Sequence, residues 1–281
     1  METMTEYSVS GNDDRRNKEQ KLIALDVDGT LVDHDGAMTD EVREAARAVV
    51  DAGHQVIIAT GRSLQATLPV IERIGLQTGF GVCCNGGVTV RLDPSLPGGF
   101  EVVHKETFSP RDALTALRST LPAAMYAVEA ADGEFLSTSS FQDASFGIRA
   151  RSVDFEELLD ARAVRVVVHS QEVPLAEFEA AVQGIGLHGV TYSVGWSAWL
   201  DIAAAGVTKA SALEKLRADL RLDASSTVAV GDGFNDVEML RWAHRGVAMG
   251  QAPQGVQDAA SEITASVYDD GAARVLRSIL A

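Results

Sequence analysis

The feature that most limits the fold of this chain is an alternation of short apolar runs with segments of amphipathic helical pattern. The apolar runs predict strands buried on both faces of a sheet, at residues 21–25, 55–59, 81–84, 200–203 and 227–230. Helices are expected at about 39–53, at 63–74 with a kink or restart at Pro69, and at 208–220. Strands that alternate with helices form a parallel sheet covered on both faces, so the predicted fold class is α/β with a doubly wound core.

Residues 88–195 interrupt this alternation and predict a separate α+β unit. Within it, strands are expected at 125–129, 163–169 and 190–194, and helices from Pro110 and at 175–182. Glycines at 87 and 195 mark where the insertion begins and ends. The predicted organisation is a core of 21–87 and 196–281, an insertion at 88–195, and a polar segment at 1–20 that is expected to be disordered.

The charge balance excludes several classes of partner. The 281 residues contain 40 Asp and Glu against 24 Lys and Arg, a formal net charge of −16. Nucleic acids and anionic membranes require clustered basic side chains, so neither is an expected partner. The adjacent Cys83 and Cys84 supply neither a disulfide framework nor a zinc site. No apolar stretch is typical of a signal peptide or a membrane span, which predicts a cytoplasmic protein, either a monomer or a small homo-oligomer.

Polar side chains that can carry chemistry follow the predicted strands or open a helix. Asp26 and Asp28 come directly after the first strand, and Thr60 comes after the second. Lys209 lies in the first turn of the helix that begins near 208. Three more polar residues follow the strand at 227–230, namely Asp232, Asn235 and Asp236. Ligands of open α/β sheets bind at the carboxyl ends of the strands, so these side chains are expected to converge there.

Four gathered carboxylates require a compensating cation. Without one, Asp26, Asp28, Asp232 and Asp236 would raise one another's pKa values. Oxygen ligands without His or Cys favour a hard cation, and a few carboxylates completed by water suit Mg²⁺ better than Ca²⁺. Beside Lys209 and a threonine hydroxyl, a Mg²⁺ site has the parts that phosphoryl transfer needs.

Six ordered segments of this chain resemble the haloacid dehalogenase superfamily of phosphatases, most closely its Cof-like branch. They are LDVDGT at 25–30, ATGR at 59–62, CNGG at 84–87, GVTK at 206–209, GDGFNDVEML at 231–240 and GVAMG at 246–250. The insertion lies where that branch carries its large type-two cap, which selects the substrate. The branch usually continues after GVAMG with Asn-Ala, whereas this chain continues with Gln251-Ala252-Pro253. That departure bears on loop contacts near the site.

The resemblance implies a mechanism and a role for each residue. Asp26 would be the nucleophile that forms an aspartyl phosphate, and Asp28 the general acid and base. Mg²⁺ would be held by Asp26, by the backbone carbonyl of Asp28 and by Asp232. The residues that bind the phosphoryl group would be Thr60, Gly61, Lys209 and Asn235. Asp236 would orient Lys209 or a metal-bound water.

The function predicted from these residues is Mg²⁺-dependent hydrolysis of a small phosphorylated metabolite, with a sugar phosphate as the expected substrate. A phosphomutase would use the same residues and return the phosphoryl group to a sugar hydroxyl. A non-catalytic sensor would need no nucleophile, yet Asp26 and Asp28 are both present. Arg62 either approaches the substrate or carries a surface charge, and Trp196 and Trp199 are expected to pack where the insertion rejoins the core.

Overall fold

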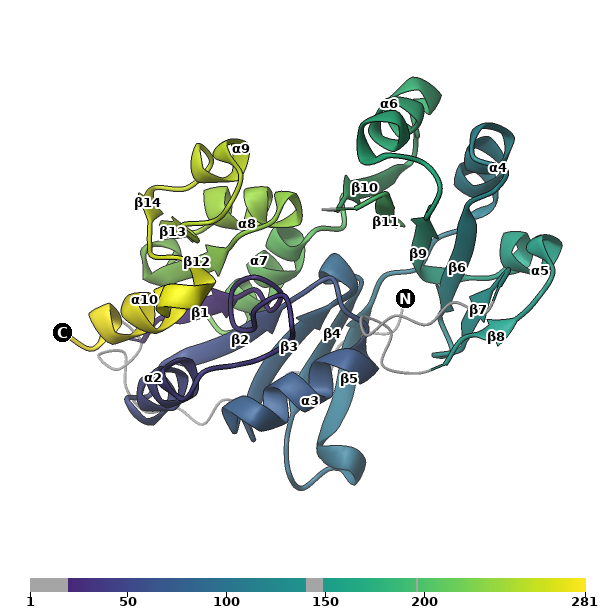
Figure 1. Ribbon diagram of the computed structural model, residues 1–281. Coiled ribbons are helices and arrows are strands. Elements are labelled where there is room, and N and C mark those ends of the chain that lie inside the picture. Colours follow the sequence, from purple (N-terminus) through teal and green to yellow (C-terminus); the bar gives the residue numbers. More distant parts are fainter. Residues whose placement is uncertain (1–19, 140–148, 196) are drawn as a thin grey trace.

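The computed structural model describes residues 20–139, 149–195 and 197–281, and the statements that follow concern these residues. Their strands form two sheets, one of eight strands and one of six. Figure 1 shows the larger sheet with helices on both faces and the smaller sheet beside it with its own helices. The predicted disorder of the N-terminal segment and the packing predicted for Trp196 fall on residues outside this description.

The larger sheet is the core, and most of it is parallel. Its order is β14 (Glu262–Ile263), β13 (Arg245–Ala248), β12 (Thr227–Gly231), β1 (Leu22–Leu25), β2 (Gln55–Ala59), β3 (Gly79–Cys83), β4 (Val88–Leu92) and β5 (Phe100–Lys105). Neighbours from β14 to β3 run parallel, whereas β4 and β5 are antiparallel additions at one edge. The α/β class expected from the sequence is confirmed.

Helices cover both faces of the core sheet. One face packs against α2 (Asp40–Asp51), α3 (Leu64–Ile74) and α10 (Gly271–Ile279). The other packs against α7 (Lys209–Asp219), α8 (Val237–Trp242) and α9 (Gln254–Gln257). Successive side chains of a strand point to opposite faces, so Ile23 of β1 joins the first cluster and Ala24 joins the second. A run that is apolar at every position is therefore what a doubly covered strand requires.

Helix α3 excludes the restart at Pro69, one of the two alternatives that the sequence left open. It runs without a restart through Pro69, and the Ser63 side chain caps it by accepting a hydrogen bond from the backbone N–H of Ala66. A proline inside a helix removes the bond that its own N–H would donate four residues back, here to Gln65, and its ring crowds the carbonyl of that residue. Gln65 is exposed, so water can satisfy that carbonyl. The helix then ends at Gly75, which has a left-handed backbone.

The smaller sheet forms the cap. Its order is β10 (Val190–Val194), β11 (Trp199–Ala204), β9 (Ala163–His169), β6 (Met125–Ala130), β7 (Phe135–Ser137) and β8 (Arg151–Ser152). Three helices pack on one face of it: α4 (Arg111–Thr120), α5 (Phe155–Asp160) and α6 (Leu175–Ile185). Figure 1 shows α4 and α6 on the side of this sheet away from the core. The cap is thus an α+β unit, as the sequence predicted.

Strand pairing moves both boundaries expected for the insertion. Strands β4 and β5 fall inside the predicted 88–195, yet β4 pairs with β3 in the core sheet. Strand β11 was expected in the core, yet it pairs with β9 and β10 in the cap. A short apolar strand has the same local pattern in either sheet, so only its long-range partners decide where it belongs. The cap therefore lies between β5 and α7.

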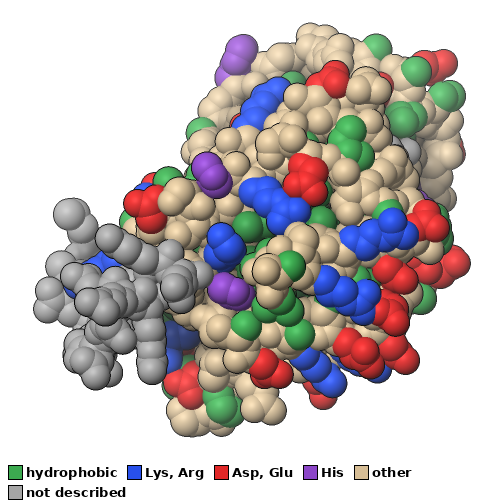
Figure 2. All heavy atoms as spheres, turned by 90° about the vertical axis from the view of Figure 1, so that its left-hand side faces the viewer, with side chains coloured by type: hydrophobic (Ala, Val, Ile, Leu, Met, Phe, Trp, Pro, Cys, Tyr) green, Lys and Arg blue, Asp and Glu red, His purple; other side chains and the backbone are tan. Residues whose placement is uncertain are grey.

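Charged side chains of both signs lie near one another on one face of the molecule (Figure 2). Figure 2 shows one face, on which Lys and Arg lie among Asp and Glu. Two ion pairs between elements are of this kind, Arg277 of α10 with Glu41 of α2 and Arg245 of β13 with Glu262 of β14. No helix within the described ranges combines the length and the apolar character needed to cross a membrane. The cytoplasmic location expected from the sequence stays a prediction.

Candidate active site

The site lies where the order of the core sheet reverses direction. From β1 the chain continues to β2 on one side, and it returns after the cap to β12 on the other side. In open α/β sheets the crevice at such a point, beyond the carboxyl ends of the strands, is where ligands bind. Asp26 directly follows β1, Thr60 follows β2 and Asp232 follows β12, and all three are buried.

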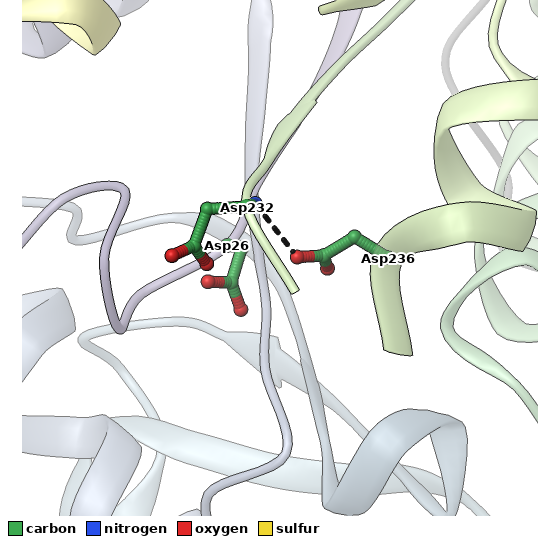
Figure 3. Close-up of side chains that lie close together, drawn as sticks. All are labelled: Asp26, Asp232 and Asp236. Carbon is green, nitrogen blue, oxygen red and sulfur yellow. Dashed lines mark hydrogen bonds between the residues drawn. The ribbon is translucent and has the colours of Figure 1, made fainter. Parts of the chain in front are cut away.

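Three carboxylates come together at this crevice. Asp26, Asp232 and Asp236 each offer an oxygen, and these oxygens lie within 4.8 Å of one another. Figure 3 shows the side chains of Asp26 and Asp232 next to each other, with Asp236 reaching in from the turn that leads into α8. The Asp236 carboxylate also accepts hydrogen bonds from the backbone N–H of Asp232 at 3.0 Å and of Gly233 at 2.9 Å. Asp236 is therefore tied to the loop that carries Asp232.

Lys209 joins two of these carboxylates. Its fully buried Nζ donates to Asp26 Oδ1 at 2.6 Å and to Asp236 Oδ1 at 2.7 Å. With Asp232, the cluster holds three carboxylates and one ammonium, an excess of two negative charges when all are ionised. A divalent cation would balance that excess, and an all-oxygen donor set suits a hard cation. The residues present therefore fit a metal site.

The titration of these groups reflects the same charge excess. Burial, then repulsion from Asp236, raises the pKa of Asp26 well above its ordinary value, despite the nearby Lys209. Burial and repulsion from Asp236 also raise the pKa of Asp232, to about 7. Burial alone would lower the pKa of Lys209, but the attraction of Asp236 and Asp26 together raises it. Lys209 thus stays charged, and the acids release their protons more readily once a cation is bound.

Helix α7 delivers Lys209 from its first position. The helix is fixed by a capping box in which the Thr208 hydroxyl accepts from the Ser211 backbone N–H and the Ser211 hydroxyl accepts from the Thr208 N–H. The turn after β3 packs directly against this helix start. A Cβ on Gly86 would lie 2.2 Å from the Thr208 carbonyl oxygen, so only glycine allows the approach.

The loop after β1 depends on Gly29. This residue has a φ of +74°, and a Cβ added to it would lie 2.0 Å from Asp232 Oδ2. Glycine therefore serves two purposes: it permits the left-handed backbone and it leaves room for the carboxylate. The turn that follows Asp28 can then pass close to Asp232.

The carboxylate of Asp28 does not join the acidic cluster. It is more than half exposed and accepts two hydrogen bonds from the Arg62 guanidinium, at 2.9 Å from Nε and 2.5 Å from Nη2. Both side chains line the cavity described below. The structure thus places Arg62, which the sequence left open, inside the site. A metal contact through the backbone carbonyl of Asp28 stays a prediction.

The residues predicted to bind phosphate lie around the same crevice. The buried Thr60 hydroxyl accepts a hydrogen bond from the Arg62 backbone N–H at 3.1 Å. Gly61 and Asn235 line the cavity, and Asn235 Nδ2 donates to Asn85 Oδ1 at 2.9 Å. Asn85 has a left-handed backbone and was matched only as part of the CNGG segment. The carboxyl-edge placement predicted for these residues is what the structure shows, and their roles stay predictions.

A cavity of about 280 Å³ lies between the core and the cap. The core side includes Asp26, Asp28 and Asp232, and the cap contributes Arg165, Ser193, Trp199 and Asp201. Arg165, Ser193 and Asp201 belong to none of the motifs recognised in the sequence. One available signal was a lone arginine inside an otherwise apolar strand, AVRVVVH, because a buried charge in such a run needs a reason. Trp199 packs within the cap sheet and not where the insertion was expected to rejoin the core, and it also lines the cavity.

Gln251, the residue that departs from the Cof-like pattern, contacts the site. Its Nε2 donates to the Gly29 carbonyl at 2.6 Å and lies 3.3 Å from Asp232 Oδ2. Its Oε1 accepts from the Val267 backbone N–H at 3.0 Å. Gln251 thus links the loop after β13 to both Gly29 and Asp232.

A haloacid dehalogenase-like hydrolase family matches residues 23–276. The chain belongs to this family. Relatives that match along nearly its whole length include phosphatases. The 5-amino-6-(5-phospho-D-ribitylamino)uracil phosphatase YcsE of Bacillus subtilis is 27% identical over 266 residues, covering 94% of this chain and 97% of its own. The pyridoxal phosphate phosphatase YbhA of Escherichia coli is 27% identical over 285 residues, covering 92% and 98%.

Solved structures agree with this assignment. The phosphatase BT1666 of Bacteroides thetaiotaomicron is 26% identical, with a TM-score of 0.74 over 96% of this chain and 98% of its own. The subclass IIB sugar phosphatase BT4131 has a TM-score of 0.75 at 23% identity, covering 92% and 98%, and that likeness concerns the fold alone. The protein is therefore a Cof-like phosphatase of the haloacid dehalogenase superfamily, a hydrolase of phosphomonoesters.

Proposed function

We propose that this phosphatase hydrolyses a small phosphorylated metabolite, with sugar phosphates as the expected class, through Mg²⁺-dependent formation of an aspartyl phosphate. The observation that carries the proposal is the buried Lys209, which bridges Asp26 and Asp236 beside Asp232 at one end of a cavity of about 280 Å³. Relatives named for small phosphorylated compounds, YcsE and YbhA, support the size of the substrate.

The proposed metal ligands are Asp26, Asp232 and the backbone carbonyl of Asp28. Bound there, Mg²⁺ would neutralise charge on the phosphoryl oxygens. Asp236 already accepts hydrogen bonds from Lys209 and from two backbone N–H groups. Its proposed role is therefore to hold the Lys209 ammonium in place, and not to act as a metal ligand. Lys209 and the Thr60 hydroxyl, together with the backbone of Gly61 and the amide of Asn235, would hold the phosphoryl group against Asp26.

The reaction then proceeds in two displacements. In the first, an Asp26 carboxylate oxygen attacks phosphorus, the bond to the leaving oxygen breaks, and Asp28 gives that oxygen a proton. In the second, Asp28 takes a proton from a water that attacks phosphorus, and the bond to Asp26 breaks to release inorganic phosphate. Arg62 donates two hydrogen bonds to the Asp28 carboxylate at the cavity wall. The cap would exclude bulk water and contact the leaving group.

The test is release of inorganic phosphate from a panel of sugar phosphates, nucleotides and one aryl phosphate. We expect turnover by the wild type with Mg²⁺ and at least about a hundredfold loss with chelator or in Asp26→Asn, since both remove a group that acts on phosphorus. Asp51→Asn is the matched control, because Asp51 is an exposed aspartate at the end of α2. It should keep wild-type activity.

Three outcomes would contradict the proposal. The first is a folded wild type that binds Mg²⁺ and releases phosphate from none of the compounds. The second is an isomeric sugar phosphate that accumulates without free phosphate, which would indicate a phosphomutase. Turnover that survives Asp26→Asn would reject Asp26 as the nucleophile.

A further inference from the structure

The face of the cap sheet toward the core carries an unusual set of polar side chains. Strand pairing sets Glu129 of β6 opposite Arg165 of β9, and Ser193 of β10 opposite Asp201 of β11. Trp199 lies two residues before Asp201 on the same face, because side chains alternate along a strand. Four of these residues, all but Glu129, line the cavity that the core site opens into.

The opposite face of the same strands is apolar. Val166 and Val168 of β9 and Leu200 of β11 pack in the cluster formed with the cap helices. Charges buried under a sheet cost stability that apolar residues of similar volume would not, so packing alone does not account for Arg165 on the inner face. The arrangement points to recognition of a ligand on that face.

The charge of Arg165 is already balanced by the protein. Its Nη1 donates to the Gly61 carbonyl at 2.5 Å and lies 3.6 Å from Asp201 Oδ1, and its Nε lies 3.4 Å from Glu129 Oε2. One guanidinium between two carboxylates leaves this wall with an excess of one negative charge. Arg165 is thus bound to its neighbours, and the wall as a whole repels a further anion.

Trp199 and Asp201 give the wall a mixed character. The Trp199 indole N–H donates to Asp201 Oδ2 at 3.0 Å, which fixes the ring beside the carboxylate. Asp201 remains partly exposed, at 19% of its side chain. An aromatic ring offers apolar contact area, while a carboxylate accepts hydrogen bonds from hydroxyl or amine groups.

We infer that Trp199, Asp201 and Ser193 form the leaving-group subsite, and that it selects phosphomonoesters whose leaving group is neutral or cationic over those with a second anionic group. The inference rests on the proposed phosphatase activity and names the substrate class of the same cavity. Asp201 is the residue that determines this charge preference, and Glu129 supports it by neutralising Arg165.

The test uses three aryl phosphates of similar size whose para substituents are aminomethyl, hydroxymethyl and carboxylate. We measure kcat/KM of each compound for the wild type and for Asp201→Asn. For a compound that is bound but not cleaved, we measure instead its inhibition constant against an aryl phosphate that is hydrolysed. The ratio of variant to wild type for each compound cancels the intrinsic reactivity of the three leaving groups. Asp201→Asn should improve the carboxylate compound relative to the aminomethyl compound by about tenfold.

The control is Glu177→Gln, which makes a comparable charge change on α6, a cap helix on the far face of the sheet. Glu177 is exposed, and its substitution should leave all three ratios near one. If Asp201→Asn does not fold, Glu129→Gln is the second variant. It leaves Arg165 with one carboxylate, and it should also favour the carboxylate compound.

The outcomes separate this inference from the proposed function. Absence of phosphate release by the wild type from every compound tested, the sugar phosphates and nucleotides included, would overturn the proposed function, and with it this inference. Hydrolysis with no preference between the aminomethyl and carboxylate compounds, unchanged in both variants, would overturn the subsite alone. A ratio of variant to wild type that rises for the aminomethyl compound relative to the carboxylate compound in Asp201→Asn would likewise overturn the subsite, because it is the opposite of the inference.

Discussion

Single residues of the acidic cluster are held by partners from distant parts of the chain. Lys209 from the start of α7 reaches Asp26 after β1, and Gln251 from the loop after β13 reaches Asp232 after β12. Each partner removes part of the cost of burying a carboxylate. Loss of one partner should therefore leave a buried charge uncompensated, with an effect on stability as well as on activity.

Lys209→Met is expected to destabilise the metal-free protein by about 3–5 kcal/mol at neutral pH, because it leaves Asp26 and Asp236 buried without their cation. Phosphatase activity should fall by at least about a hundredfold, as expected when a group that stabilises transition-state charge is lost. Urea denaturation in chelator and phosphate release measure the two effects. Lys215→Met removes an exposed lysine of the same helix and should cost about 0–1 kcal/mol. Equal losses in both variants would contradict the prediction.

Gly29→Ala and Gly36→Ala separate backbone strain from crowding at the metal site. The two glycines have φ values of +74° and +76°, but only a Cβ on Gly29 meets Asp232, while one on Gly36 meets nothing within 4 Å. Both variants should lose about 1–2 kcal/mol from the left-handed backbone. Gly29→Ala should in addition lose most activity and weaken the Mg²⁺ response. The prediction fails if activity in Gly29→Ala equals that in Gly36→Ala.

Among the elements, α7 has two tasks, because it packs on the core sheet and presents Lys209 at its first position. Its N-cap Thr208 therefore affects both stability and the site. Helix α2 also has a threonine N-cap, Thr39, whose side chain accepts from the Val42 N–H. Nothing of α2 reaches the cavity among the residues described as lining it. The two caps thus form a natural comparison.

Thr208→Ala and Thr39→Ala should each destabilise the fold by about 1 kcal/mol, the usual cost of losing an N-cap. Only Thr208→Ala should also lower kcat, since fraying of the first turn of α7 displaces Lys209. Thermal denaturation and steady-state kinetics on one aryl phosphate distinguish the effects. A kcat in Thr208→Ala as high as that in Thr39→Ala would show that the capping box does not position Lys209.

At the scale of the whole molecule, proton and metal binding are linked to folding through Asp232. Its pKa in the folded, metal-free protein is about 7 against an ordinary 3.8. Between those two pH values the folded state binds more protons than the unfolded chain. The contribution of this group to the free energy of unfolding is therefore present at low pH and is lost as pH rises toward the folded pKa.

Mg²⁺ should consequently raise the melting temperature more at about pH 8 than at about pH 5.5, because it binds the ionised carboxylate and competes with the proton. Thermal denaturation with Mg²⁺ and with chelator gives the rise in melting temperature that the metal causes at each pH. Comparing the two rises cancels the effect of groups whose titration the metal does not change. Asp232→Asn should remove most of the difference. An equal increment at both pH values in the wild type would reject the linkage.

The sequence by itself determined the doubly wound core and most of the site. Apolar runs mark strands that are covered on both faces. The polar residues directly after such strands must lie at one edge of a parallel sheet, so Asp26, Thr60 and Asp232 could be placed from the local pattern alone. The sequence left a kink or a restart open at Pro69, because a proline has the same local signature inside one helix as at the boundary between two.

Only the tertiary structure decided which sheet β4, β5 and β11 join, and therefore where the cap begins and ends. The cavity wall at Arg165 and Asp201 and the contact from Gln251 to Asp232 were likewise set by tertiary structure. The physical reason is common to these cases. The partners of a strand and the ion pairs between distant segments depend on long-range register. A short strand or a lone polar residue has the same local pattern whichever of several possible partners it meets.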